Sequence, residues 1–369
     1  MKKLVIIGAN DFQNQLILKA KSLNYETHVF AWEDGAVGKE TADYFYPISI
    51  IEKEKILEKC QEIQPVGVCS IASDLAAITV NYVAENLGLP CNQTKYTEIQ
   101  TNKYRMREAL QSAGIPCPKF ILADDSFDRS MIAGFRFPII VKPTDRSGSR
   151  CVMKLESPEG IESAIAEACA VSFEKKAIIE EYIDGDEYSM ETISFQGQHH
   201  YLATTMKFTT GAPHFIETGH KQPSGLSEEI NDRAKKVVLK ALDALHIENS
   251  AGHSEFKVDP NGSIHIIEIG ARMGGDCIGS DLVYLSTGID FMKMVIDVAC
   301  GIAPVFPKGK EQNKVEIHFI FTQDDFDGLE EIKQKTPETI YRISNLELEN
   351  MGNTVDSSSR VGYYIVSER

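Results

Sequence analysis

The sequence predicts a mixed fold in which a parallel α/β unit precedes an α+β unit. Over residues 1–95, short apolar strand-like runs alternate with helix-like runs. That alternation is typical of right-handed βαβ units on a parallel sheet. From Phe120 onward, paired strand-like runs and amphipathic helices replace it. The 369 residues suffice for two or three structural units with several buried cores.

The first unit is expected to be Rossmann-like. Its apolar runs predict strands over residues 4–7, 27–31 and 66–71. Helical spacing of apolar residues predicts helices over residues 15–23, 53–63 and 75–87, the last of them closed by Gly88.

The second unit begins with a helix predicted over residues 103–113, which ends at Gly114. The patterns then predict strands over 136–143 and 176–183 around a helix at 158–171, a hairpin joining 187–195 to 200–208, and helices at 228–245 and 290–300. After residue 304 a tail carries two further strand-like runs, 314–321 and 362–366. We therefore expect an α+β unit over 96–304 and a small C-terminal part over 305–369.

Composition excludes several classes of partner. The formal net charge is -16, which does not favour binding to nucleic acid or to anionic lipid. The first residues contain no signal-peptide core, and no apolar stretch approaches the length of a membrane span. The eight scattered cysteines form no CxxC pair and read as reduced thiols. We expect a cytoplasmic protein that binds neither nucleic acid nor membrane.

The segment from His253 to Arg272 reads as a β-hairpin that carries two carboxylates. Its two strand-like runs flank Asp259-Pro260-Asn261-Gly262, a turn sequence. Counting outward from the turn places Glu255 opposite Ile266. Because side chains alternate between faces, Glu268 then shares a face with Glu255 as a diagonal neighbour about 7–8 Å away.

Two carboxylates on one face repel each other unless a cation lies between them, and hard oxygen ligands suit Mg²⁺. Arg272 follows Glu268 by four residues, and a guanidinium beside a metal suits a phosphorylated intermediate. The alternative is a hairpin with two solvated glutamates. An odd-length loop with a bulge would also change the parity.

A lysine and a polar loop suggest an anion site. Lys142 interrupts the buried run FPIIVKP, and a lysine is rarely buried unless it is paired. The loop TDRSGSR follows, and the backbone N–H groups around Ser147, Gly148 and Ser149 could surround phosphates. The alternative is a strand-end lysine that extends its ammonium to solvent.

The hairpin segment closely resembles a known family. The residues HSEFKVDPNGSIHIIEIGARMGGD look like the metal-binding segment of the ATP-grasp superfamily, most of all its L-amino acid ligase (dipeptide synthetase) branch. The likeness extends to SDLAAITVNYVAENLGLP, QTNKYRMREALQSAGIPCP and SSSRVGYYIV, and so spans nearly the whole chain. It implies a pre-ATP-grasp domain over 1–95, an ATP-grasp domain over 96–304 whose residues 115–185 form a mobile ATP-binding lobe, and a β-rich C-terminal subdomain over 305–369.

The resemblance also implies roles for residues of the hairpin. Glu255 and Glu268 would hold Mg²⁺, with Mn²⁺ as a substitute, and Arg272 would contact the phosphates and the reacting acyl group. Many family members carry Asn as a further metal ligand where this chain has Gly270. The metal coordination would then be completed by water or by another group.

ATP binding is implied by a set of residues earlier in the chain. Lys103 and Lys142 would reach the phosphates, together with the loop Ser147–Ser149. The next residue, Arg150, stands where the family often has Gly. In the segment IIEEYIDGDEYSMET, backbone groups would read adenine and one carboxylate would hold the ribose; the matching residues are Glu180, Tyr182, Ile183 and Glu187. The alternative for Glu187 is a surface acid beside a turn.

Substrate binding is implied by the segment GAPHFIETGHKQPSG, which reads as a long ordered loop. Its Glu217 and His220 have the spacing that L-amino acid ligases use for the amino end of the substrate. The alternative is a surface acid and a solvated histidine. Asp276 corresponds to a second-substrate pocket, where its charge suggests a cationic or amine-bearing partner. Lys207 is expected to face the site without an assigned role.

The resemblance thus implies an ATP-dependent ligase. It would form an amide or peptide bond between a small-molecule carboxylate and an amine through an acyl phosphate, releasing ADP and phosphate. Lys142 and Arg272 would offset the charge of the transition state. The loops TDRSGSR and GAPHFIETGHKQPSG are the expected lid. A homodimer is one expected assembly.

Three alternatives stay open from the sequence. One is an ATP-grasp ligase of purine or carbamoyl-phosphate metabolism, and another is an ATP-binding protein that has lost catalysis. The third takes VIIGAN as the start of a dinucleotide-binding unit, although a full GxGxxG is missing.

Overall fold

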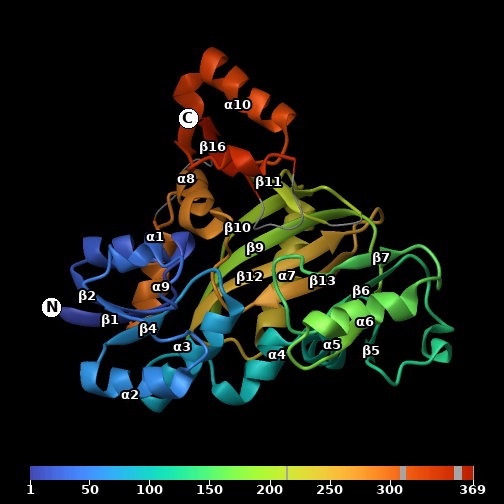
Figure 1. Ribbon diagram of the computed structural model, residues 1–369, viewed down its shortest axis with the longest axis horizontal. Helices are drawn as coiled ribbons and strands as arrows, with labels where there is room; N and C mark the ends of the chain where they lie inside the picture. The colour runs from blue at the N-terminus through green and yellow to red at the C-terminus, as the bar shows by residue number, and fades with distance from the viewer. Residues whose placement is uncertain (213–214, 308–312, 353–359, 369) are drawn as a thin grey trace.

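The computed structural model describes residues 1–212, 215–307, 313–352 and 360–368. Three sheets make up the described chain. The N-terminal sheet lies at one end and a small antiparallel sheet at the other, with a large sheet between them, and the C-terminal strands continue the large sheet toward the top of the view (Figure 1). This arrangement matches the predicted α/β and α+β class.

The first sheet is parallel and four-stranded, with the order β3-β2-β1-β4. Its strands are β1 (Lys2–Ile7), β2 (Tyr25–Phe30), β3 (Tyr44–Tyr46) and β4 (Gly67–Cys69). The connecting helices are α1 (Asp11–Ser22), α2 (Lys53–Ile63) and α3 (Asp74–Asn86). The Rossmann-like expectation is confirmed, and each predicted helix lies within four residues of the observed one at either end.

The second sheet is antiparallel with the order β5-β8-β6-β7. Its strands are β5 (Phe120–Ala123), β6 (Ile139–Pro143), β7 (Met153–Leu155) and β8 (Ala177–Glu181). Helices α4 (Thr97–Thr101) and α5 (Lys103–Ser112) precede it, and α6 (Ile161–Val171) packs on it. The prediction that α6 begins at residue 158 is wrong, because Gly160 is in the left-handed conformation with φ +78° and ends a turn there.

The third sheet has eight strands in the order β13-β12-β9-β10-β11-β14-β16-β15. They are β9 (Asp186–Phe195), β10 (Gln198–Thr209), β11 (Glu217–Gln222), β12 (Ser250–Val258), β13 (Ile264–Gly270), β14 (Lys314–Ile320), β15 (Ile340–Ile343) and β16 (Gly362–Glu368). The accompanying helices are α7 (Glu228–Ala244), α8 (Val283–Thr287), α9 (Phe291–Ala299) and α10 (Gln323–Lys335). Since β14 pairs with β11, the C-terminal strands continue the large sheet.

The register of the β12–β13 hairpin differs from the expected one. Glu255 lies directly opposite Glu268 and not opposite Ile266. The loop has five residues, because Val258 pairs with Ile264 and not with Ser263, and a bulge adds Ile267 between the paired positions. Each departure shifts the pairing by one residue. The two shifts together preserve the parity, so both carboxylates still share a face.

The prediction that Glu217 and His220 lie in a long loop is wrong, because both belong to strand β11. Tertiary pairing with β10 and β14 makes this polar segment extended. A bulge in the β10–β11 register inserts Thr218. Residues three apart on a regular strand face opposite sides, so the bulge is what turns Glu217 and His220 toward one side.

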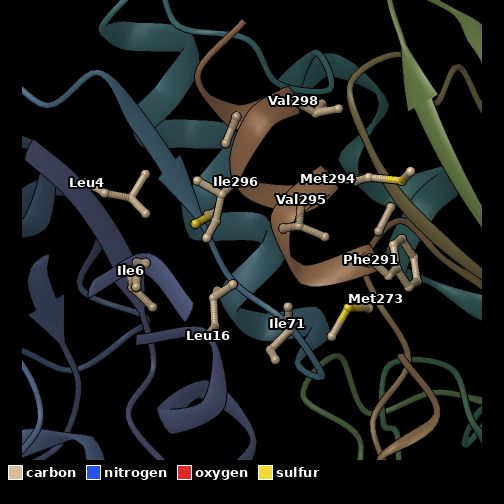
Figure 2. Close-up of a cluster of buried hydrophobic side chains, with 14 of the residues drawn as sticks. Leu4, Ile6, Leu16, Ile71, Met273, Phe291, Met294, Val295, Ile296 and Val298 are labelled. Atoms are coloured by element: carbon tan, nitrogen blue, oxygen red, sulfur yellow. The ribbon is translucent and has the colours of Figure 1, made fainter. Parts of the chain in front are cut away.

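Helix α9 joins the first domain to the large sheet. Its side chains Phe291, Val295 and Ile296 share one buried cluster with Leu4 and Leu16 of the first domain (Figure 2). The same cluster contains residues of β9 and β10. A shared apolar core therefore orients the first domain relative to the large sheet.

We predict that Gly185→Ala destabilises the fold more than Gly88→Ala. Both glycines have positive φ, but an added Cβ at Gly185 would lie 2.1 Å from the Val258 carbonyl oxygen, whereas at Gly88 nothing lies within 4 Å. We expect a loss of about 3 kcal/mol in the free energy of unfolding at Gly185 and of about 1 kcal/mol at Gly88. Urea denaturation measures both. Equal losses would contradict the proposed clash.

Candidate functional site

Two adjoining cavities lie between the small sheet, the large sheet and the first domain. One, of about 170 Å³, is bounded largely by the small and large sheets, and the other, of about 410 Å³, extends toward the first domain and the C-terminal segment. Both are lined by Lys207, Glu217, Glu255 and Arg272. Every residue that the sequence proposed for the site lines one cavity or both.

Each carboxylate of the hairpin pair is accompanied by a lysine. Lys103 Nζ lies 2.8 Å from Glu268 Oε1, and Lys207 Nζ lies 2.6 Å from Glu255 Oε1. Burial by itself would raise the pKa of Glu255, but the charge of Lys207 and a hydrogen bond from His253 outweigh it and hold that pKa well below its usual range. Glu255 is therefore available as an anionic ligand.

Lys207 is the centre of a larger cluster. Besides Glu255, its ammonium lies 3.0 Å from Glu187 and 3.8 Å from Glu217. Burial would lower the pKa of Lys207, yet these carboxylates raise it well above its usual value. The sequence assigned no role to this lysine, because nothing in its strand indicates that three acids from other strands surround it.

Arg272 is held by a residue of the first domain that the sequence analysis missed. Its Nε lies 2.9 Å from Asp74 Oδ1, and one terminal nitrogen lies 3.3 Å from Oδ2. Burial would raise the pKa of Asp74, but the charge of Arg272 lowers it. In sequence, Asp74 looks like an ordinary acid in the first turn of a helix, so the signal for its role was absent.

Gly270 has a structural explanation in the same place. A Cβ at this position would lie 3.1 Å from the guanidinium carbon of Arg272 and 3.2 Å from Asp74 Oδ1. A side chain at this position would therefore crowd the Arg272–Asp74 ion pair, which would have to shift by a few tenths of an ångström.

A second pair that the sequence missed, His253 and Glu191, contacts Glu255 through the imidazole ring. His253 Nδ1 lies 2.5 Å from Glu191 Oε1, and its Nε2 lies 3.3 Å from Glu255. Burial would lower the pKa of His253, but the buried carboxylate of Glu191 raises it to about 9. The available signal was alternation, since His253 precedes Glu255 by two residues and so shares its face.

In the smaller cavity, Lys142 is buried and paired. Its ammonium lies 2.6 Å from the Glu180 carboxylate, which also lies 2.7 Å from Arg107 Nε. Arg107 is fully buried. The sequence proposed that backbone groups of Glu180 read adenine, whereas its side chain anchors two cations. Arg107 was missed because an arginine inside a helix pattern gives no sign of burial.

An apolar slot adjoins this lysine. Its walls include Ile140, Val152, Ile267 and the ring of Tyr182, whose centroid lies 6.3 Å from that of Phe215. The Tyr182 N–H donates to the Pro138 carbonyl, so the hydrogen-bonding groups for a flat ligand here would be the Tyr182 carbonyl and the backbone of Ile183.

The two loops expected to form a lid meet over the cavity. Gly148 and Ser149 both adopt left-handed φ angles, of +74° and +54°, which turn the loop sharply. The Ser149 hydroxyl donates to the Phe215 carbonyl at 3.2 Å. Residues 213–214 of the second loop lie outside the described chain.

The far end of the larger cavity collects Glu217, His220, Asp276 and Arg360. His220 Nε2 lies 3.5 Å from Asp276, and the Arg360 guanidinium contacts Asp276 at 2.8 and 3.0 Å. The charge of Asp276 is thus already met within the protein, which removes the basis for expecting a cationic partner. Arg360 was missed because its segment indicated only a closing strand.

The donor set suits a hard divalent cation. Glu255 and Glu268 are a cross-strand pair with carboxylates directed into one cavity. Within the described ranges no group of three or more His, Cys, Asp or Glu side chains is placed to hold a metal by itself. Two carboxylates completed by phosphate or water oxygens are the pattern that Mg²⁺ prefers.

In the part of the chain that the structure describes, no helix is both long enough and apolar enough to cross a bilayer.

Comparison with known proteins gives one domain match and several relatives. Residues 135–281 match the ATP-grasp domain. Alanine–anticapsin ligase of Bacillus subtilis is 28% identical over 307 residues, which cover 73% of this chain and 64% of that protein. D-alanine–D-alanine ligase B of Chromobacterium violaceum is 30% identical over 206 residues, covering 53% and 66%. This chain thus spans slightly less than two thirds of these curated relatives.

Among solved structures, the L-amino acid ligase from Bacillus licheniformis superposes with a TM-score of 0.83 at 25% identity. The match covers 100% of this chain and 93% of the other. The likeness therefore includes the first domain and the C-terminal strands as well as the region of the domain match.

We predict that Glu180→Gln destabilises the protein far more than Glu181→Gln on the same strand. The first change leaves Arg107 and Lys142 without their shared anion in a buried place, which costs about 3 kcal/mol. Glu181 pairs with Arg136, whose side chain is 87% exposed, so its loss costs at most about 1 kcal/mol. Chemical denaturation distinguishes these outcomes, and similar losses would refute a structural role for Glu180.

Proposed function

We propose that this chain, whose residues 135–281 match the ATP-grasp domain and which is similar to L-amino acid ligases, is an ATP-dependent carboxylate–amine ligase. Its substrates would be an amino acid, which supplies the carboxylate, and a small amine. The observation that carries the proposal is the cross-strand pair Glu255–Glu268, whose carboxylates face one cavity. Arg272 lies where the two cavities meet, between the apolar slot beside Tyr182 and the end that contains His220 and Asp276.

ATP fits the smaller cavity by its chemistry. The apolar slot beside Tyr182 suits adenine, and Glu187 can accept the ribose hydroxyls. Lys103, Lys142 and the loop around Gly148 supply positive charge and N–H donors for the phosphates. This orientation directs the terminal phosphate toward Arg272.

Glu255 and Glu268 would hold Mg²⁺, or Mn²⁺ in its place, and the metal would neutralise phosphate charge. Lys103 and Lys207 contact the same carboxylates, so each lysine would share its glutamate with the ion. Lys207 also contacts Glu187 and Glu217 and can remain paired with them.

The reaction follows from these positions. A carboxylate oxygen attacks the γ-phosphorus, the bond from that phosphorus to the bridging oxygen of ADP breaks, and an acyl phosphate forms. The amine then attacks the acyl carbon, phosphate leaves, and the nitrogen loses a proton to give the amide. Arg272 and Lys142 offset the negative charge that develops on the transferred group, which is electrostatic stabilisation by groups already in place.

Glu217 and His220 would bind the ammonium of the amino acid, because a carboxylate oxygen and an imidazole nitrogen can accept hydrogen bonds from it. The location proposed is the cytoplasm, supported by eight cysteines that are all free thiols.

The test is a screen for ADP release over pairs of amino acids and small amines, with hydroxylamine as a general acceptor that traps acyl phosphates as hydroxamates. We expect release that requires both partners, and a loss of about 10²-fold or more in Glu268→Gln. Glu229→Gln, an exposed change on α7, is the matched control and should retain wild-type turnover. Release by Glu268→Gln at the wild-type rate would disprove the metal assignment. A wild-type enzyme inactive with every pair would disprove the ligase.

We also predict that Asp74→Asn lowers kcat while the KM for ATP changes little. The amide cannot hold the guanidinium of Arg272 as a bidentate carboxylate does, so the arginine would lose its orientation toward the reacting group. We expect a reduction of roughly tenfold or more in kcat, from steady-state kinetics. Asp11→Asn, an exposed acid of the same domain, is the control. A selective rise in the KM for ATP would contradict this role.

A further inference from the structure

We propose that Arg360 sets the side-chain charge for which the site selects. By neutralising Asp276, it makes the pocket favour amino acids with uncharged side chains over cationic and anionic ones. The inference rests on the proposed ligase function, since it concerns the amino acid that supplies the carboxylate.

The contact between Arg360 and Asp276 has the form of a strong ion pair. Two guanidinium nitrogens reach the two carboxylate oxygens at 2.8 and 3.0 Å, a bidentate arrangement. The guanidinium also lies 3.6 Å from the centroid of the Phe319 ring, which supports it from one side. Only 11% of the Arg360 side chain is exposed, so the pair is little screened by solvent.

The ion pair lies beside the proposed ammonium site. His220 Nε2 is 3.5 Å from Asp276, and the Arg360 guanidinium is 3.5 Å from the Glu217 carboxylate. All four residues line the same cavity of about 410 Å³. In an amino acid the side chain and the ammonium are attached to one carbon. A substrate whose ammonium meets Glu217 and His220 therefore places the beginning of its side chain close to the Asp276–Arg360 pair.

The balance of charge then decides which side chains fit. A cationic side chain would have to displace the guanidinium from Asp276 and would meet Arg360 as a like charge. An anionic side chain would have to displace Asp276 from the guanidinium and would meet Asp276 as a like charge. Binding of either charged side chain would separate the bidentate Asp276–Arg360 pair, and breaking such an ion pair away from solvent costs binding free energy. An uncharged side chain leaves the pair intact.

The loop that carries Asp276 is held in place by the C-terminal strands. Asp276 and Cys277 both have left-handed φ angles, +52° and +60°, a strained conformation that persists only where the surroundings impose it. Arg342 of β15 lies 2.8 Å from Asp281, in the helical turn Ile278–Leu282 that follows the loop, and 3.2 Å from the Cys277 sulfur. Arg360 therefore contacts Asp276 directly, whereas Arg342 contacts only residues that follow it.

The two arginines allow a matched comparison. Arg342 lines neither of the two cavities, so changing it perturbs the loop without altering the charge of the pocket. Arg342→Lys keeps the cation beside Asp281 and serves as the control for indirect effects on the loop.

The experiment measures hydroxamate formation with hydroxylamine as the constant acceptor, so that only the carboxylate partner varies. Norleucine, lysine and glutamate provide uncharged, cationic and anionic side chains of similar length. The enzymes are wild type, Arg360→Met, Asp276→Asn, the double variant and Arg342→Lys. Calorimetric binding of the same amino acids to each enzyme gives a second reading of selectivity that does not require turnover.

We expect wild type to prefer norleucine. Arg360→Met should shift the ratio of kcat/KM values about tenfold or more toward lysine, because Asp276 loses its partner, and Asp276→Asn should shift it similarly toward glutamate. The double variant should return to norleucine, and Arg342→Lys should keep the wild-type ratios. A wild type that prefers a charged side chain, or single variants with unchanged ratios in turnover and in binding, would overturn the inference. Binding with the expected selectivity but no hydroxamate from any enzyme would reject the ligase and leave the charge assignment supported.

Discussion

Three carboxylates that converge on one buried lysine are the constraint on which the site depends. Four neighbouring strands of the large sheet each supply one member of this cluster: Glu255 from β12, Glu187 from β9, Lys207 from β10 and Glu217 from β11. Carboxylates this close would repel one another in a poorly solvated place, and the ammonium of Lys207 offsets that repulsion. The register of four strands and the charge state of the site are consequently linked. A one-residue slip would turn one of the acids to the other face and leave Lys207 underpaired.

Strand irregularities decide where these acids point. The bulge at Ile267 brings Glu268 directly opposite Glu255, and the bulge at Thr218 puts Glu217 and His220 on one side of β11. Regular strands would separate both pairs. Bulges at such places redirect side chains at little cost to the rest of a sheet, because the extra residue disturbs only the local pairing.

The two ends of the chain complete the site from opposite sides. Asp74 of the first domain holds Arg272, and Arg360 of the C-terminal segment holds Asp276, four residues further along. Met273 and Phe291, which lie on either side of the Asp276 loop, are both in the core shared with the first domain. The segment 270–281 is thus restrained by an apolar core on one side and by paired charges on the other. Loss of either ion pair would loosen residues that line the two cavities.

Local pattern was sufficient for much of this protein. Alternating strand and helix signals determined the parallel first domain, and period-two alternation placed Glu255 and Glu268 on one face. The motif around Arg272 indicated phosphate chemistry, which stays a prediction, because residue type and spacing within one hairpin are properties of the sequence itself. The tertiary structure decided the partners: Asp74 for Arg272, Arg107 for Glu180, Glu191 for His253, three acids for Lys207 and Arg360 for Asp276. It also made a strand of the polar segment at Glu217. The physical reason is that a buried charge is stabilised by whichever opposite charge the fold brings near it, and that partner lies on another element whose own sequence carries no sign of the encounter.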